Sequence, residues 1–208
     1  MANIASDTDQ LLDRAAAGDH SSREKLLERH RKKLRRMVAV RLDRRILARV
    51  DPSDIVQEAL ADANRRLDDY LRERPLPYYP WLRRLACDRL AKARRRHTAR
   101  RRSVEREEPP RIPNESAMEL AERLLAPDTD PARAALRKEK RQRVRALLDE
   151  LAPGDREVLV LRFLERLSTA EAAAVLEISA GAVRLRLMRA LDRLRHNLGD
   201  NSLGEDMQ

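Results

Sequence analysis

The sequence predicts an all-α protein made of two small helical domains that a proline-rich linker joins. Apolar residues recur at intervals of three and four, and no segment shows the alternation of a convincing strand. Aromatic residues, which favour strands, make up only 2% of the 208 residues, so the cores must consist of Leu, Ala, Val and Ile. Five of the ten prolines lie between Val104 and Pro131, where they interrupt any helix.

The N-terminal domain is expected over residues 1–103 and contains four helical segments. Asp7 is the candidate N-cap of the first segment, and Gly18 is its stop signal. The second segment, "SSREKLLERHRKKLRRMVAVRL", places its apolar residues mostly on one broad stripe. Pro52 and Ser53 open the third segment, "SDIVQEALADANRRLDDYL", and the fourth is "WLRRLACDRLAKARRRHTARRR". In the third segment an apolar residue recurs every four positions, at Ile55, Ala59, Ala63 and Leu67.

Three further parts follow the N-terminal domain. Residues 104–131 are expected to form the linker, residues 132–199 the C-terminal domain and residues 200–208 a tail. Within the linker a short helix is predicted over Ser116–Leu125, because "SAME" fits a capping box. Both domains have a workable size for small independent units.

The C-terminal domain contains four helical segments, and the last two are typical of a helix-turn-helix motif. The first is "PARAALRKEKRQRVRALLDEL", and Pro153 begins the second, "PGDREVLVLRFLE". Ser168 and Glu171 form a capping box at the start of the third, a helix of about eight residues. After a short break, Ser179 caps a long last helix. The apolar stripe of this last helix comprises Val183, Leu187, Leu191, Leu194 and Leu198.

The charge of the chain indicates a polyanionic partner. The formal net charge is +10, which favours DNA, RNA or an acidic membrane surface. In a helix-turn-helix motif the second helix enters the major groove by its N-terminal turns. Four arginines of the last helix lie mostly outside its apolar stripe, namely Arg184, Arg186, Arg189 and Arg193. The alternative interpretation is a solvated helix face, which explains most charged helices.

A second basic concentration lies in the fourth N-terminal segment. Between Trp81 and Ser103, ten cations face a single acid, Asp88, so the net charge is +9. Neutralised phosphates would release counterions, which gives affinity and a steep dependence on salt. Tyr78, Tyr79 and Trp81 are three of the five aromatic residues, and aromatic rings beside cations suit unstacked bases. For Trp81 taken alone, an anchor in the domain core is the better interpretation.

Several classes of protein are not expected. No apolar run approaches the length of a membrane span, and the N-terminus lacks the pattern of a secretory signal. The single cysteine, Cys87, cannot form an internal disulfide, so a reducing cytoplasm is the expected location. The histidines are scattered, and Asp54 and Glu58 have no third ligand nearby, so neither a metal nor a cofactor is expected. No cluster of nucleophile, base and metal ligands indicates an enzyme.

Together the two halves resemble an extracytoplasmic-function (ECF) sigma factor, the compact class of bacterial RNA polymerase sigma subunits. The segment "DPSDIVQEALADANRRL" is similar to sigma region 2.2, and "YYPWLRRLACDRLAKARRRH" is similar to regions 2.3 and 2.4. The C-terminal segment "LAPGDREVLVLRFLERLSTAEAAAVLEISAGAVRLRLMRALDRLR" resembles region 4. The resemblance implies a helical region 2 bundle and a region 4 helix-turn-helix domain. It also implies binding to core RNA polymerase and promoter DNA, a chain that is monomeric when free, and control by an anti-sigma factor.

The resemblance also implies three sets of site residues. The set that docks on the polymerase comprises Asp54, Ile55, Val56, Gln57 and Glu58. The set that opens and reads the downstream promoter element comprises Tyr78, Tyr79, Trp81, Arg84, Asp88, Arg89, Lys92, Arg95 and Arg96. The set on the upstream recognition helix comprises Ser179, Gly181, Ala182, Arg184, Leu185, Arg186 and Arg189.

Two departures from the family pattern concern promoter preference. Asp88 stands where family members often carry Asn, and it can accept a hydrogen bond from a cytosine amine. Leu185 lies about 200° around the helix from Val183, so it should be exposed, where it can touch a thymine methyl group. Strand opening would rest on Tyr78, Tyr79 or a loop residue such as Asn64.

Two other functions stay open from the residues. A helix-turn-helix regulator would bind a palindrome in duplex DNA as a dimer and would need no polymerase. No N-terminal segment resembles a ligand-binding or receiver domain, which counts against this alternative. An RNA-binding adaptor would use the cations between Arg94 and Arg102.

Overall fold

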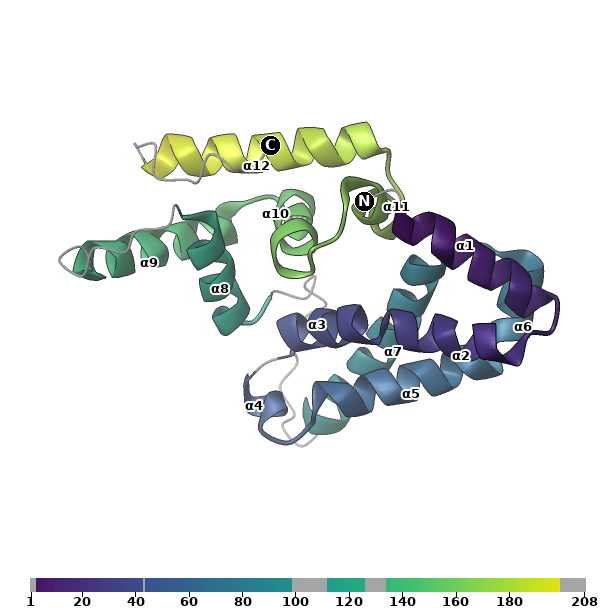
Figure 1. Cartoon of the computed structure of the whole chain (residues 1–208). Helices are drawn as coiled ribbons and strands as arrows, with labels where there is room; N and C mark the ends of the chain where they lie inside the picture. Colours follow the sequence, from purple (N-terminus) through teal and green to yellow (C-terminus); the bar gives the residue numbers. More distant parts are fainter. Residues whose placement is uncertain (1–2, 43, 99–111, 126–133, 199–208) are drawn as a thin grey trace. The chain divides into compact units, whose positions relative to one another are not determined.

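The computed structural model describes residues 3–42, 44–98, 112–125 and 134–198, and these residues form helices and connecting turns without a strand. The predicted all-α class is therefore confirmed over this part of the chain. The chain divides into two compact units, Met1–Val104 and Glu105–Gln208 (Figure 1). The predicted tail and half of the expected linker lie outside the described residues, as do the cations at positions 100–102.

The N-terminal unit is built around the packing of three helices. Its core lies between α3, α5 and α7, while α1 packs against α2 and α6. Leu34, Met37 and Val38 of α3 are fully buried, and so are Ala63 of α5 and Ala86 of α7. The helices are α1 Asn3–Ala16, α2 His20–Arg29, α3 Arg31–Arg41, α4 Arg44–Leu47, α5 Pro52–Arg65, α6 Leu67–Glu73 and α7 Tyr78–Thr98.

Two of the predicted N-terminal helices are each divided in the structure. His30 is the C-cap of α2 and the N-cap of α3, and Arg66 has the same position between α5 and α6. Apolar spacing does not reveal these breaks, because buried residues continue on both sides of them. His30 itself is only 6% exposed, and its ring lies 5.7 Å from that of Tyr78 and 5.5 Å from that of Tyr79.

Of the two predicted ends of the first helix, the stop at Gly18 is confirmed and the N-cap at Asp7 is wrong. Gly18 follows α1 with a φ of +93°, a left-handed conformation that glycine adopts without strain, so the predicted stop is confirmed. Asp7 does not cap α1, because the helix already begins at Asn3 and Asp7 lies inside it. Its carboxylate accepts a hydrogen bond from Arg29 of α2 at 3.2 Å instead.

The C-terminal unit consists of five α-helices and a π-helical turn among the described residues. Helix α8 packs on α9 and on the turn η2, while α12 packs on α9, α10 and α11. Leucines fill the core, and the largest fully buried ones are Leu120, Leu124, Leu148, Leu159, Leu161 and Leu164. The elements are α8 Asn114–Leu124, α9 Ala134–Glu150, α10 Pro153–Leu159, η2 Val160–Leu164, α11 Thr169–Leu176 and α12 Ala180–Leu198.

Local capping signals in this unit are largely confirmed. The Ser168 backbone N–H donates to the Glu171 carboxylate at 2.8 Å, and the Glu171 N–H donates to the Ser168 hydroxyl at 3.2 Å. Ser179 caps α12 by accepting from the Ala182 N–H at 3.1 Å. The predicted capping box at Ser116 is wrong, because α8 begins at Asn114 and Ser116 already lies within its first turn.

Candidate polymerase and nucleic-acid interfaces

The start of α5 separates the predicted polymerase-docking residues into two groups. Ile55 and Val56 are 4% and 1% exposed, so they pack in the core and cannot reach a partner. Asp54, Gln57 and Glu58 are exposed, because positions three and four apart share one face of a helix. The surface group is therefore a short acidic and polar face, and the buried group fixes the helix that carries it.

A side-chain cap fixes the beginning of this face. The Asp51 carboxylate accepts a hydrogen bond from the Ser53 backbone N–H at 2.7 Å. That hydrogen bond, a second one to the Ser53 side chain and the charge of Arg35 hold the pKa of Asp51 below its usual value. Pro52 occupies the first turn, where its missing N–H costs no hydrogen bond. The cap thus holds Asp54 at the first turn of α5.

A polar and mainly basic stripe runs along α7. Its five members are exposed, and they recur at helical spacing on one side of the helix. The opposite side packs inward through Leu82, Leu85, Ala86 and Leu90. We call this surface the α7 stripe; it comprises Arg84, Asp88, Lys92, Arg95 and Arg96.

Arg89 does not belong to the α7 stripe, contrary to its predicted role as a DNA contact. Its guanidinium forms ion pairs with Asp62 and with Glu58, the latter at 3.1 Å, and both partners lie on α5. The Arg89 side chain is 20% exposed and that of Asp62 only 12%. Arg89 therefore joins α5 to α7.

The sequence analysis did not identify Asp62, the buried partner of Arg89 in the contact between α5 and α7. Burial acts to raise the pKa of Asp62, but the hydrogen bonds and charges of Arg89 and Arg65 outweigh it and hold the pKa below its usual value. The hydrogen bond to Asp62 in turn raises the pKa of Arg89. Asp62 lies four residues after Glu58, on the same side of α5, which is the only sequence signal for the pair.

The tyrosines predicted to stack on opened bases lie in the core. Tyr78 is 3% exposed and Tyr79 is 4% exposed. Helix α7 begins at Tyr78, three residues earlier than predicted, and this start places both rings against His30. The Tyr79 ring packs on His30 and the Tyr78 ring packs on Tyr70, so neither ring is available to stack on a base.

Trp81 is part of the same aromatic cluster. It is partly exposed and stacks on Tyr70, with ring centroids 4.4 Å apart. The Tyr70 hydroxyl donates to the Leu76 carbonyl at 3.0 Å, and burial raises the pKa of Tyr70 to about 12. Burial also raises the pKa of Tyr78. This geometry agrees with a structural role for Trp81. Asn64, expected in a loop, lies in the last turn of α5 and is exposed, so it is left as the candidate for a base contact.

The exposed side of α12 carries the predicted recognition residues. Gly181, Arg184, Leu185 and Arg189 are exposed, while Ala182 and Arg186 are partly buried. Leu185 is 50% exposed, as predicted, and Met188 next to it is 56% exposed. The predicted apolar stripe is buried at Val183, Leu191 and Leu194, while Leu187 and Leu198 are only partly buried.

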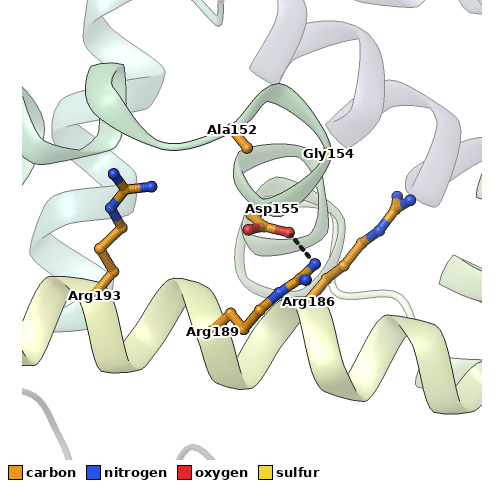
Figure 2. A pocket seen from close by; sticks show the side chains of 6 residues that line it. All are labelled: Ala152, Gly154, Asp155, Arg186, Arg189 and Arg193. Atoms are coloured by element: carbon orange, nitrogen blue, oxygen red, sulfur yellow. Dashed lines mark hydrogen bonds and ion pairs between the residues drawn. The ribbon is translucent and has the colours of Figure 1, made fainter.

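A basic hollow of about 470 Å³ lies between α12 and the start of α10. Figure 2 shows three arginines of α12 extending toward Ala152, Gly154 and Asp155. Arg189 forms an ion pair with Asp155, with Nη2 and Oδ1 3.2 Å apart. Arg186 covers Gly154 so closely that a Cβ atom there would lie 3.0 Å from its Nη1. The lining arginines are Arg186, Arg189 and Arg193.

Comparisons with known proteins give matches to the C-terminal helices and to most of the chain. Residues 141–194 match the family described as Sigma-70, region 4, a stretch that includes α11 and most of α12, the two helices of the helix-turn-helix motif. The ECF RNA polymerase sigma factor SigD of Mycobacterium tuberculosis is 30% identical over 190 residues, which cover 91% of this chain and 83% of SigD. The chain belongs to the ECF sigma-factor family.

A second relative covers nearly the same extent. The ECF RNA polymerase sigma-E factor of Escherichia coli K12 is 30% identical over 193 residues, which cover 90% of this chain and 92% of that protein. Among solved structures, CnrH in complex with the cytosolic domain of CnrY is 27% identical, with a TM-score of 0.48, and the match covers 92% of this chain and 97% of CnrH.

Membership of the family decides between the functions that the residues left open. This ECF sigma factor directs transcription initiation, and the alternative of a regulator that acts without polymerase is not favoured. The aligned lengths include both structural units, so the sigma identity rests on more than the helix-turn-helix motif. No helix in the described ranges is long and apolar enough to cross a membrane.

Proposed function

We propose that this sigma factor uses three separate surfaces to bind core RNA polymerase and the two promoter elements. The exposed face of α5, made by Asp54, Gln57 and Glu58, docks on core RNA polymerase. The α7 stripe holds the downstream promoter element, and the exposed side of α12 reads the upstream element. The observation that carries the proposal is the α7 stripe, because it concentrates exposed cations on the helix that the family resemblance assigns to DNA.

The chemistry of the two DNA surfaces supports different contributions. Arg95 and Arg96 stand at the end of α7 and contribute charge, which acts on phosphate whatever the base sequence. Asp88 lies within the stripe and cannot bind phosphate favourably, so we assign it to a base edge such as a cytosine amine. On α12 the neighbouring Arg184 and Leu185 combine a hydrogen-bond donor with an apolar group, which suits a guanine next to a thymine.

We further propose that the free chain is a monomer in the cytoplasm and that an anti-sigma factor controls it. Leu185 and Met188 offer an exposed apolar surface on the same helix that reads DNA. A protein that covers these side chains would exclude DNA from α12. The chain itself supplies no chemical step in this function and uses no cofactor, because promoter recognition rests on binding alone.

The docking assignment predicts a specific loss of affinity for core polymerase. Asp54→Ala removes an exposed carboxylate that does not contact Arg89, and it should weaken core binding several-fold without changing the helical content. Asp69→Ala is the matched control, because Asp69 is an exposed acid on α6 whose ion pair with Arg72 is local to that helix. Titration of labelled chain with core polymerase provides the measurement. Equal affinities for the two variants would contradict the assignment of the α5 face.

A further inference from the structure

The basic hollow in the C-terminal unit contains one carboxylate among the six described residues that line it. This carboxylate, Asp155, belongs to the first turn of α10, and its side chain is 16% exposed. Val158 and Leu159, one turn later on the same helix, are fully buried, so the core holds the carboxylate in place. Arg186, Arg189 and Arg193 enter the same hollow from α12 (Figure 2).

The Arg189 side chain is fixed by an ion pair and is still exposed enough to contact DNA. One of its Nη atoms lies 3.2 Å from Asp155 Oδ1, yet its side chain remains 56% exposed. A guanidinium has five N–H donors, and Asp155 accepts from one of its nitrogens. The other side of the group can therefore still form the paired hydrogen bonds that an arginine makes to guanine.

An arginine whose side chain is fixed before binding contacts DNA differently from an arginine that moves freely. Fixing a long side chain in advance removes part of the entropy that it would lose on binding a base. The same fixation limits how far the guanidinium can turn toward phosphates, which carry no sequence information. A fixed carboxylate behind an exposed arginine therefore favours cognate DNA over other sequences.

We propose that Asp155 is a positioning residue that orients Arg189 for base recognition in the upstream promoter element. The proposal rests on the proposed role of α12 as the recognition helix. Its motivation is the ion pair between a fixed carboxylate on α10 and a half-exposed arginine on α12, residues that lie 34 positions apart in the chain.

Asp155→Asn tests this role because it keeps the size of the side chain and removes the charge. The variant chain, assembled with core polymerase, is incubated with promoter DNA in which the upstream element is randomised, and the bound fraction is sequenced. We expect the preference at one base pair to fall by about two- to tenfold, the factor for immobilising one long side chain. Arg189→Ala should relax the same position, and adding Asp155→Asn to it should change nothing further at that position.

Two comparisons make the outcome specific. Asp192→Asn is the matched control, since it removes an equal charge from an exposed acid of α12 that is 3.7 Å from Arg195 and lies outside the hollow. On non-promoter duplex, the Asp155→Asn chain should bind more tightly than the Asp192→Asn chain, because its released Arg189 can contact phosphate.

The possible failures are distinguishable from one another. If the unaltered chain with polymerase shows no preference in the upstream element, the assignment of α12 fails, and the positioning role fails with it. If the unaltered chain shows the preference and Asp155→Asn retains it at every position, only the positioning role is overturned. A uniform gain in affinity without a change of preference overturns it as well, because Asp155 would then act merely as a competing anion.

Discussion

At the scale of single residues, Asp62 shows how one buried carboxylate changes the role of an arginine. Its side chain is 12% exposed and pairs with Arg89 of α7 and Arg65 of α5. Removing a carboxylate from water is costly unless hydrogen bonds and opposite charge compensate, and the two arginines supply both. Arg89 is therefore assigned to the contact between α5 and α7, and Glu58 is shared between that contact and the α5 face.

The Asp62 pair predicts a defined dependence of stability on pH. Because the pKa of Asp62 is lowered in the folded chain, the unfolded chain takes up this proton first as the pH falls. The stabilising contribution is present above the ordinary carboxyl pKa of 3.8 and is lost as the pH falls through the lower folded value. Asp62→Asn should therefore lose less stability than the unaltered chain on acidification below about pH 5.

Urea unfolding at neutral pH measures the size of the same effect. Asp62→Asn should lower the free energy of unfolding by about 1–3 kcal/mol, the range for disrupting a partly buried charged hydrogen bond. Trp81 is the only tryptophan of the sequence and lies in the N-terminal unit, so its fluorescence follows the unfolding of that unit. Asp69→Asn, which disrupts an exposed pair, should leave stability nearly unchanged. A similar loss in both variants would contradict a special role for Asp62.

At the scale of elements, α7 buries one side in the core and exposes a mainly basic side to solvent. Leu82, Leu85 and Leu90 pack inward, while the α7 stripe faces solvent. Such a helix concentrates positive charge at the surface without weakening the core. Its cations repel one another at helical spacing, and a bound polyanion relieves that repulsion.

The α7 stripe predicts a change in the salt dependence of DNA binding. Arg95→Gln with Arg96→Gln should flatten the slope of log affinity against log salt by about 1.4–1.8 if both residues contact phosphate. The measurement is a salt titration of the full chain on a forked promoter fragment. Arg66→Gln with Arg72→Gln removes the same charge from exposed positions away from the stripe, and it should change the slope much less. Identical slopes for the two double variants would show that the stripe does not face DNA.

Sequence reasoning predicted the local features of these elements better than the long-range ones. The capping box of Ser168 and Glu171 involves residues three positions apart, so the chain itself carries the signal. The breaks at His30 and Arg66 leave the apolar spacing intact and could not be predicted from it. The exposure of Leu185 followed from helix geometry alone.

The roles that the structure revised depend on residues far apart in the chain. Arg89 and Asp62 are 27 positions apart, and no local pattern indicates that they meet. Tyr79 was predicted to meet bases because cations follow it, but its ring packs on His30, a residue between α2 and α3. Composition and spacing can therefore assign a surface to a helix, whereas the partner of each side chain requires the fold.

At the scale of the whole molecule, each of the two units carries candidate interfaces of its own. The N-terminal unit carries the α5 face and the α7 stripe, and the C-terminal unit carries the helix-turn-helix motif with its basic hollow. Helix α8, expected as a linker helix, packs on α9, and Glu122 of α8 forms ion pairs with Arg137 and Arg141 of α9. The described helices of the C-terminal unit thus begin before the stretch that matches region 4.

The central claim is that this chain gives core RNA polymerase its choice of promoter, and transcription in vitro tests it most directly. Core polymerase is supplied with the full chain and a library of promoter sequences, and the 5′ ends of the transcripts are sequenced. We expect transcripts to begin at a fixed distance from a pair of sequence elements. Arg184→Ala should alter the upstream preference, and Arg95→Gln with Arg96→Gln should reduce the number of transcripts from all promoters. Transcription that is no more promoter-dependent than that of core polymerase alone would contradict the account.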